Sequence, residues 1–327
     1  MNKVAVIRAS ILAHLIEQIE QTNLSADALL ARHGLMKAQI ADPYFRVPLS
    51  RYVPLFEDAA QLLGMPHLGA LLGTRITPRD LGPAGVLFSV SPTILDGLVR
   101  LTRHIMAIQS STTNGLRLIE GNYVWTYQLS AAKLWPRRQE SEFTLSSSCQ
   151  LIRSSFSRNW RPLEVHFEHD EPPDTKRLEA IFRAPLKFGQ SSNRLIIAPA
   201  DAERVYRSDD TDIVTVLEQH ILQLEARDTE QSSLAQRVKS LIGIHLGHRR
   251  VTVALLAADL GMAARTLQRR LAEEGTSLRS LVEEYRQDIV EMQMKAGTRK
   301  MRIADTLGYA DSTVLWRARK RWRHLDE

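Results

Sequence analysis

The sequence LLAADLGM at residues 255–262 recurs as a pattern 47 residues later, where residues 302–309 read RIADTLGY. In both copies a small Ala stands four residues before a Gly, and an apolar residue, Met262 or Tyr309, follows that Gly. The Ala lets a second helix approach closely, and the Gly readily adopts the backbone conformation of a tight turn. Each copy therefore predicts two helices joined by a short turn.

A segment rich in long polar side chains follows each predicted turn. The first reads AARTLQRRLAEE at residues 263–274, and the second reads DSTVLWRARKRW at residues 311–322. Arg pairs bidentately with guanine, Gln pairs with adenine, and Lys or Arg neutralises phosphates. Both segments are candidate recognition helices. An isolated helix pair with a Gly turn is more often a plain helical hairpin, so the DNA hypothesis depends on the repeat.

The segment between the two copies, SLRSLVEEYRQDIVEMQMKAG at residues 277–297, predicts one long helix. Its apolar residues recur at helical spacing: Leu278, Leu281, Val282, Tyr285, Ile289 and Met292. Such a helix would hold the two units at a fixed separation. Two groove-reading helices on one face of a duplex lie roughly 34 Å apart, in successive major-groove segments.

Formal charge is unevenly distributed along the 327 residues. Residues 232–327 carry 18 Lys and Arg against 11 Asp and Glu, whereas residues 1–231 carry 25 against 26. A basic excess confined to one region is the footprint of a domain that binds a polyanion. A solvated surface or an acidic protein partner would give the same excess, so charge alone leaves these alternatives open.

The region before residue 209 has a mixed pattern. In GLRLIEGNYVWTYQLS, residues 115–130, aromatic residues alternate with other residue types after position 122, which predicts a strand. Gly121-Asn122 stands between this strand and the preceding one and predicts a hairpin turn. The rings of Tyr123, Trp125 and Tyr127 suit a core more often than a ligand pocket, and both interpretations remain open. Further strands are predicted in LEVHF and RLIIAP, and helices at residues 4–21, 25–33, 50–63, 67–72, 93–109, 139–158 and 175–182.

These patterns predict an α+β sensor domain followed by an all-α domain with two helix-turn-helix units joined by a long helix. A helical stripe at residues 209–227 precedes ARDTEQSS, residues 226–233, which has no large apolar residue and is the linker candidate. The predicted division is residues 1–208 for the α+β domain, 209–231 for the connecting helix and linker, and 232–327 for the DNA-binding domain.

An enzyme is not predicted, because the G-x-S-x-G, H-E-x-x-H, G-x-G-x-x-G and P-loop patterns are missing from the sequence. In HFEHD, side chains His166 and Glu168 of a strand would point away from His169, so no metal site is expected. The single cysteine, Cys149, is expected to be a buried thiol. We predict no catalytic residue, no cofactor and no metal.

At the N-terminus the apolar residues Ile7, Ile11, Leu15 and Ile19 stand four apart with charged residues between them, which predicts an amphipathic helix and not a signal sequence. No stretch reaches the ~20 apolar residues of a membrane span. We therefore expect a cytoplasmic protein without a membrane partner.

Longer stretches resemble the AraC/XylS family of bacterial transcriptional regulators. GMAARTLQRRLAEEGTSLRSLVEEYR and IADTLGYADSTVLWRARKRW, within residues 252–322, are similar to the DNA-binding domain of that family. DPYFRVPLSRYVPLFEDAAQLLG and IFRAPLKFGQSSNRLII are similar to the arabinose-binding-type N-terminal domain of one large subgroup. The resemblance extends over nearly the whole chain and is looser in the N-terminal part.

The resemblance implies double-stranded DNA as a partner and a set of contact residues. Those of the first recognition helix are Arg265, Gln268 and Arg269, and those of the second are Ser312, Thr313, Trp316 and Arg317, with Lys320 nearer phosphate. It also implies an N-terminal domain that senses a small-molecule effector, of unknown identity and with unknown contact residues, and that often forms a homodimer. RNA polymerase is a further candidate partner. Leu315 and Arg319 stand where the family usually has aromatic residues, which predicts a second unit that contributes mainly phosphate and shape contacts.

Overall fold

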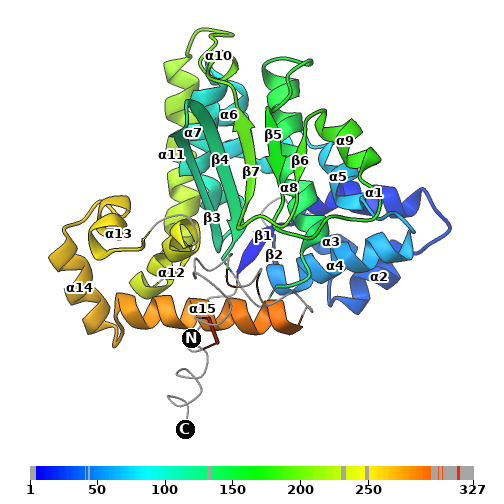
Figure 1. Cartoon of the computed structure of the whole chain (residues 1–327). Coiled ribbons are helices and arrows are strands. Elements are labelled where there is room, and N and C mark those ends of the chain that lie inside the picture. The colour runs from blue at the N-terminus through cyan, green and yellow to red at the C-terminus, as the bar shows by residue number, and fades with distance from the viewer. Residues whose placement is uncertain are drawn as a thin grey trace.

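The computed structural model describes residues 5–40, 42, 45–130, 134–229, 233–246 and 250–295, together with Met301, Ala304, Leu315 and Trp316. Figure 1 shows an N-terminal part that mixes helices with a sheet, and a C-terminal part built of helices. The mixed N-terminal part and the helical C-terminal part agree with the sequence prediction. Among the helices in these ranges, none combines the length and apolarity that crossing a bilayer requires.

The main sheet has five strands in the order β3-β4-β7-β5-β6. Adjacent strands of this sheet are antiparallel, except that β5 and β6 run parallel. A second sheet pairs β1 with β2. The strands are β1 (Val6–Arg8), β2 (Arg46–Pro48), β3 (Thr112–Ile119), β4 (Asn122–Leu129), β5 (Glu164–His166), β6 (Leu186–Lys187) and β7 (Asn193–Ile197).

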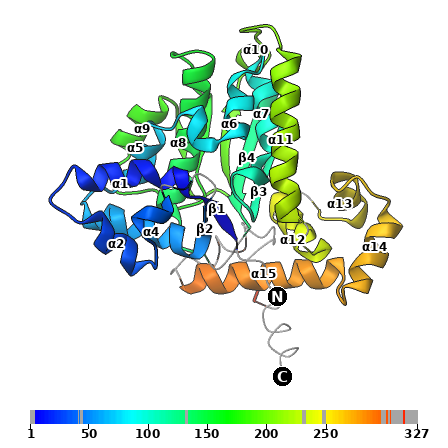
Figure 2. The same ribbon diagram turned by 180° about the vertical axis from the view of Figure 1, so that it is seen from behind.

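Helices α7 and α8 contact one face of the main sheet, and Figure 2 shows the helical layer from behind. The N-terminal helices are α1 (Ala13–Glu20), α2 (Ala26–Arg32), α3 (Lys37–Ile40), α4 (Leu49–Leu62), α5 (Leu68–Gly73), α6 (Pro83–Ser89), α7 (Ile94–Arg103), α8 (Arg138–Ser155), α9 (Lys176–Phe182) and α10 (Pro199–Ala202). The C-terminal helices are α11 (Thr211–Thr229), α12 (Leu234–His245), α13 (Val253–Asp259), α14 (Ala264–Glu273) and α15 (Leu278–Lys295). Short 3-10 helices span Ala9–Leu12, Pro78–Leu81 and Ile105–Ala107.

The predicted hairpin is confirmed, with its turn one residue earlier than expected. Glu120 and Gly121 both have positive φ, at 49° and 79°, which is the geometry of a type I′ turn. Asn122, expected in the turn, instead pairs with Ile119 in the ladder. A Gly at the second turn position removes the steric cost there.

The predicted single helix at residues 4–21 is wrong. Residues Val6–Arg8 form β1, a 3-10 turn follows, and α1 begins only at Ala13. Ile7 lies opposite Val47 of β2, some forty residues further along the chain. A distant strand thus overrides the local helical pattern, which sequence periodicity cannot reveal.

Two of the three aromatic residues of β4 belong to the core, whereas Tyr123 is half-buried. Trp125 and Tyr127 are each 1% exposed, and their rings stack at a centroid distance of 6.1 Å. The indole Nε1 of Trp125 donates to Thr102 Oγ1 of α7 at 3.3 Å. The core interpretation of these two rings is therefore confirmed.

A buried polar network joins the sheet to the start of α8. The Arg137 guanidinium donates to both carboxylate oxygens of Glu168, at 2.6 and 2.7 Å, and to the Leu129 carbonyl at 2.8 Å. Nearby, Tyr127 Oη donates to Glu140 Oε1, which also accepts from Thr144 Oγ1 at 3.1 Å. Burial raises the pKa of Glu140 to about 7.

The C-terminal helices enclose a hydrophobic cluster of their own. Its buried members include Val238 and Ile242 of α12, Leu256 of α13 and Leu267 of α14. Helix α12 also lies against β3 and β4. From the N-terminal part, Trp135 packs onto this cluster, and the Arg137 guanidinium lies 5.6 Å from the centroid of the Trp135 ring.

Helix α11 is longer at its C-terminal end than predicted, because it continues through Thr229. The first four residues of the expected linker at 226–233 are therefore helical. On α11, Val214 and Ile221 are buried while Ile213 and Val216 are exposed.

We expect Glu140→Gln to remove part of the pH dependence of stability. The pKa of Glu140 in the folded protein, about 7, lies above the ordinary value of 4.5, so the native state holds an extra proton between these pH values. The free energy of unfolding then falls as pH rises through this window, by at most about 1.4 kcal/mol per pH unit. Gln, which cannot ionise, should flatten this slope.

Thermal midpoints of both proteins, measured from about pH 5 to pH 8, test this prediction, because Glu140 changes its protonation state within this pH range. The variant should lose less stability than the original chain as pH rises. Parallel curves would contradict the assignment to Glu140.

Candidate nucleic-acid interface

Helices α13 and α14 meet at the turn that the repeat predicts. The Thr252 hydroxyl caps α13 by accepting from Leu255 N at 3.3 Å. Gly261 ends the helix with φ of +64°, and Met262 N donates back to the Ala257 carbonyl at 2.9 Å. A left-handed Gly followed by this backbone bond is the Schellman arrangement, which satisfies free carbonyls at a helix end. Ala257 itself is 2% exposed, as a close helix approach requires.

Helix α14 presents a polar face to solvent. Leu267 and Leu271 are buried in the C-terminal cluster, whereas the predicted contact residues Arg265, Gln268 and Arg269 are exposed. Arg265 and Arg269 are four residues apart and therefore lie one above the other on the helix surface. The structure thus brings together the three predicted residues of the first unit on a single helix that two leucines anchor.

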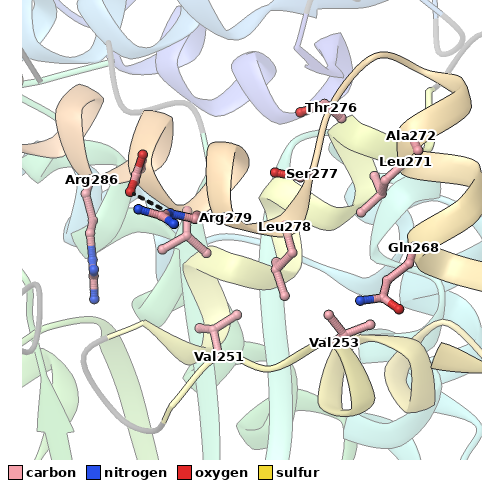
Figure 3. Close-up of a pocket in the computed structure, with 12 residues that line it drawn as sticks. Val251, Val253, Gln268, Leu271, Ala272, Thr276, Ser277, Leu278, Arg279 and Arg286 are labelled. Atoms are coloured by element: carbon pink, nitrogen blue, oxygen red, sulfur yellow. Dashed lines mark hydrogen bonds and ion pairs between the residues drawn. The ribbon is translucent and has the colours of Figure 1, made fainter. Parts of the chain in front are cut away.

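Gln268 lies toward one side of that face, beside a groove between α14 and α15 (Figure 3). The groove is open, about 550 Å³ in volume, with Val253, Leu271 and Leu278 among its lining residues. Arg279 of α15 lies on the same groove and pairs with Glu283 at 3.4 Å. Of the three predicted contact residues of α14, Gln268 is the one that lines this groove.

Arg269 forms an ion pair with Glu273 at 3.6 Å within α14. Both side chains are more than 60% exposed, at 69% and 63%. Exposed i,i+4 pairs contribute about 0.3 to 0.5 kcal/mol. The guanidinium can therefore leave Glu273 for a stronger acceptor at little cost.

A contact that was not predicted from the sequence holds α14 against α12. Glu274, the C-cap residue that follows α14, accepts hydrogen bonds from Leu234 N and Ala235 N at the start of α12, both at 2.8 Å. Lys239 of α12 also pairs with Glu284 of α15. The one available signal was electrostatic, because an acidic residue at a helix C-terminus is unfavourable unless it has another partner.

Most of the predicted second unit falls outside the described residues, including Ser312, Thr313, Arg317 and Lys320. Ala304, the counterpart of Ala257, is 0% exposed and Leu315 is 1% exposed, both in the C-terminal cluster. The predicted contact residue Trp316 is half-buried.

The residues weighed for other chemistry have ordinary partners. His166 Nε2 is 2.9 Å from Glu164 Oε2, and Glu168 is held by Arg137. Among residues that the structure describes, no group of three or more His, Cys, Asp or Glu could hold a metal ion. Cys149 is fully buried, which raises the pKa of its thiol to about 12 and matches the expected buried thiol.

Comparison with known families gives one extended match. The family described as the arabinose-binding domain of the AraC transcription regulator, N-terminal, matches residues 24–205, more than half of the chain. This range contains the five strands of the main sheet and helices α7 and α8.

The individual proteins that resemble this chain have low sequence identity to it or match only a short part of it. The HTH-type transcriptional regulator VirS of Mycobacterium tuberculosis is 24% identical over 285 residues, which span 84% of this chain and 81% of that protein. An uncharacterized HTH-type transcriptional regulator of the same species, Rv1395, is 41% identical over 68 residues, 20% of each chain. Among solved structures, the transcriptional regulator CdpR from Pseudomonas aeruginosa aligns with a TM-score of 0.44 at 19% identity, over 92% of this chain and 96% of that one.

We expect Gly261→Ala to loosen the α13–α14 pair. The φ of +64° is unfavourable for Ala, while no atom lies within 4 Å of the added methyl group, so the cost is conformational and about 1 kcal/mol. Gly261→Asn should cost less, because Asn tolerates this conformation. Amide hydrogen exchange of α13 and α14 in the full chain measures the change.

Gly64→Ala is the matched control, because Gly64 has a φ of +62° and equally open surroundings but follows α4. It should leave exchange in α13 and α14 unchanged. Equal exchange in the Gly261→Ala variant and the original chain would show that the turn does not constrain the pair.

Proposed function

Because the chain belongs to the AraC family of transcriptional regulators, we propose that it binds specific DNA sequences, with α14 as a recognition helix in the major groove. The observation that carries the proposal is the polar face of α14. Arg265, Gln268 and Arg269 are exposed on a helix whose opposite face is fixed in a core by Leu267 and Leu271.

The side chains of that face suit base reading. Arg matches the two acceptors of guanine and Gln matches the donor and acceptor of adenine in the major groove. A rigid helix pair limits the positions that these side chains can reach, and a fixed position is what turns hydrogen bonding into sequence discrimination. We assign Arg265, Gln268 and Arg269 to base-edge or groove contacts.

The proposal extends to a second unit around residues 302–322. The burial of Ala304 and Leu315 in the cluster shared with α13 and α14 supports a helix pair there, because these are the positions that such a pair would bury. We assign Ser312, Thr313, Trp316 and Arg317 to groove contacts, and Lys320 to phosphate. Helix α15 would set the spacing between the two units.

We propose residues 1–208 as the sensing domain, 209–231 as its connection and 232–327 as the DNA-binding domain. The family match within residues 24–205 supports a regulatory role for the first of these. Its ligand would be a small molecule, and a second copy of the chain and RNA polymerase are proposed as further partners. We propose no catalytic activity and a cytoplasmic location.

Selection from a random-sequence duplex pool tests the proposal. The full chain should enrich a defined motif, and binding to the enriched duplex should exceed binding to the unselected pool at every salt concentration. A basic surface that binds acidic partners without reading bases would bind all duplexes equally. Equal affinity for the enriched and unselected pools would therefore reject sequence-specific reading.

Single substitutions should separate base contacts from phosphate contacts. We expect Gln268→Ala and Arg269→Ala each to weaken binding to the enriched duplex by about 1 to 3 kcal/mol and to relax the choice of neighbouring base pairs. Lys320→Ala should weaken binding to all sequences alike, because a phosphate contact carries no sequence information. Mobility shift against both pools gives these values.

The base-reading role of Gln268 would be contradicted by equal losses on the enriched and unselected duplexes in Gln268→Ala. Arg279→Ala is a useful control, because Arg279 lies on the groove beside Gln268 but belongs to α15 and is paired with Glu283. It should leave base selectivity intact.

A further inference from the structure

Glu274 connects the end of α14 to the beginning of α12, across about 40 residues of sequence. Its two carboxylate oxygens take one backbone amide each, Oε1 from Leu234 N and Oε2 from Ala235 N, both at 2.8 Å. The first amides of a helix have no partner within that helix, and a carboxylate also interacts favourably with the positive end of the helix dipole. The contact is therefore a charged N-cap supplied by a different helix.

The backbone of Glu274 is fixed by the turn that follows it. Glu274 is the C-cap of α14, Gly275 has a φ of +73°, and Thr276 N donates to the Leu271 carbonyl at 2.9 Å. This is the same Schellman arrangement that Gly261 makes after α13. The side chain of Glu274 thus leaves the helix from a defined position, and its hold on α12 constrains where α14 can lie.

Helix α12 is in turn held by the N-terminal part of the chain. It lies against β3 and β4, and Trp135 packs onto the cluster in which Val238 and Ile242 of α12 are buried. Arg137, whose guanidinium lies near the Trp135 ring, is bound bidentately to buried Glu168. A continuous set of packed groups therefore runs from the sheet through α12 and Glu274 to α14.

We propose that Glu274 is a positioning residue for base reading, which sets α14 relative to α12 and hence relative to the sensing domain. This role rests on the proposed function of α14. Glu274 itself does not touch bases. It fixes the angle at which Arg265, Gln268 and Arg269 are presented, and discrimination between bases depends on that angle, whereas attraction to phosphates does not.

The role differs from that of a cap that only adds stability. A stability cap, once lost, lowers the thermal midpoint but leaves the folded protein reading DNA as before. Loss of a positioning residue lowers the ratio of specific to non-specific affinity at a temperature where the protein is fully folded. That ratio is therefore the decisive readout.

The experiment uses the full chain and its variants Glu274→Gln and Glu274→Ala. The probes are the duplex that the original chain enriches from a random-sequence pool and the unselected pool itself, at one fixed salt concentration. We expect the affinity ratio to fall in Glu274→Ala by up to about fivefold, the limit reached if the whole free energy of a typical N-cap is lost from specific binding, and less in Glu274→Gln, which retains one acceptor oxygen. Circular dichroism confirms that each variant is folded.

Glu283→Gln is the charge-matched control, because Glu283 lies on α15 in an exposed pair with Arg279. Removing either acid can raise affinity for all DNA by reducing repulsion, but only the Glu274 variants should change the ratio. Amide hydrogen exchange at Leu234 and Ala235 in the free protein gives a readout independent of DNA. Exchange at both amides should accelerate in Glu274→Ala and stay unchanged in Glu283→Gln.

Two results would overturn the proposal. Unchanged exchange at Leu234 and Ala235 in Glu274→Ala would show that the carboxylate does not hold α12. Faster exchange with an unchanged affinity ratio would show a stabilising cap without a positioning role. An original chain that enriches no sequence would reject the proposed function, and the positioning role with it, while the exchange result would still report separately on the contact.

Discussion

Helix α12 must satisfy two packing requirements at once. It buries Val238 and Ile242 in the C-terminal cluster, and it lies against β3 and β4 of the main sheet. Because protein interiors are densely packed, a shift of α12 on the sheet cannot leave the C-terminal helices in place. The C-terminal helices of the structure in Figure 1 are therefore not an independent appendage of the N-terminal part. Trp135 strengthens this connection from the other side, and the buried pair of Arg137 and Glu168 fixes the backbone beside it.

This arrangement gives a physical meaning to regulation. A ligand can change DNA binding only if it has different affinity for two arrangements of the protein. Two arrangements that differ in how α12 sits on the sheet would meet this condition, since α12 contacts both parts. The polar side chains of α14 would then stay exposed while the orientation of α14 relative to the sheet changes. Charge attraction to DNA would persist, and discrimination between sequences would vary.

The extent to which sequence predicts this structure follows from the range of the interactions involved. Local patterns were sufficient for the β3–β4 hairpin, for α8 and for the α13–α14 pair, because turn residues such as Gly121 and Gly261 act within a few positions. Strand β1 was missed because its partner Val47 is distant. The contacts of Glu274 and Trp135 were missed for the same reason. The exposure of Arg265, Gln268 and Arg269 was predictable from helical spacing, but the side groove beside Gln268 depends on where α15 lies.

The central claim is that α14 reads bases in the major groove, and methylation interference tests it most directly. Dimethyl sulfate methylates guanine N7, the atom that an arginine of a recognition helix contacts. On the duplex enriched by the full chain, methylated guanines in one major-groove segment should block binding, and Arg269→Ala should lose that interference while residual binding persists. Interference that is absent from the major groove, or identical in Arg269→Ala, would contradict the account.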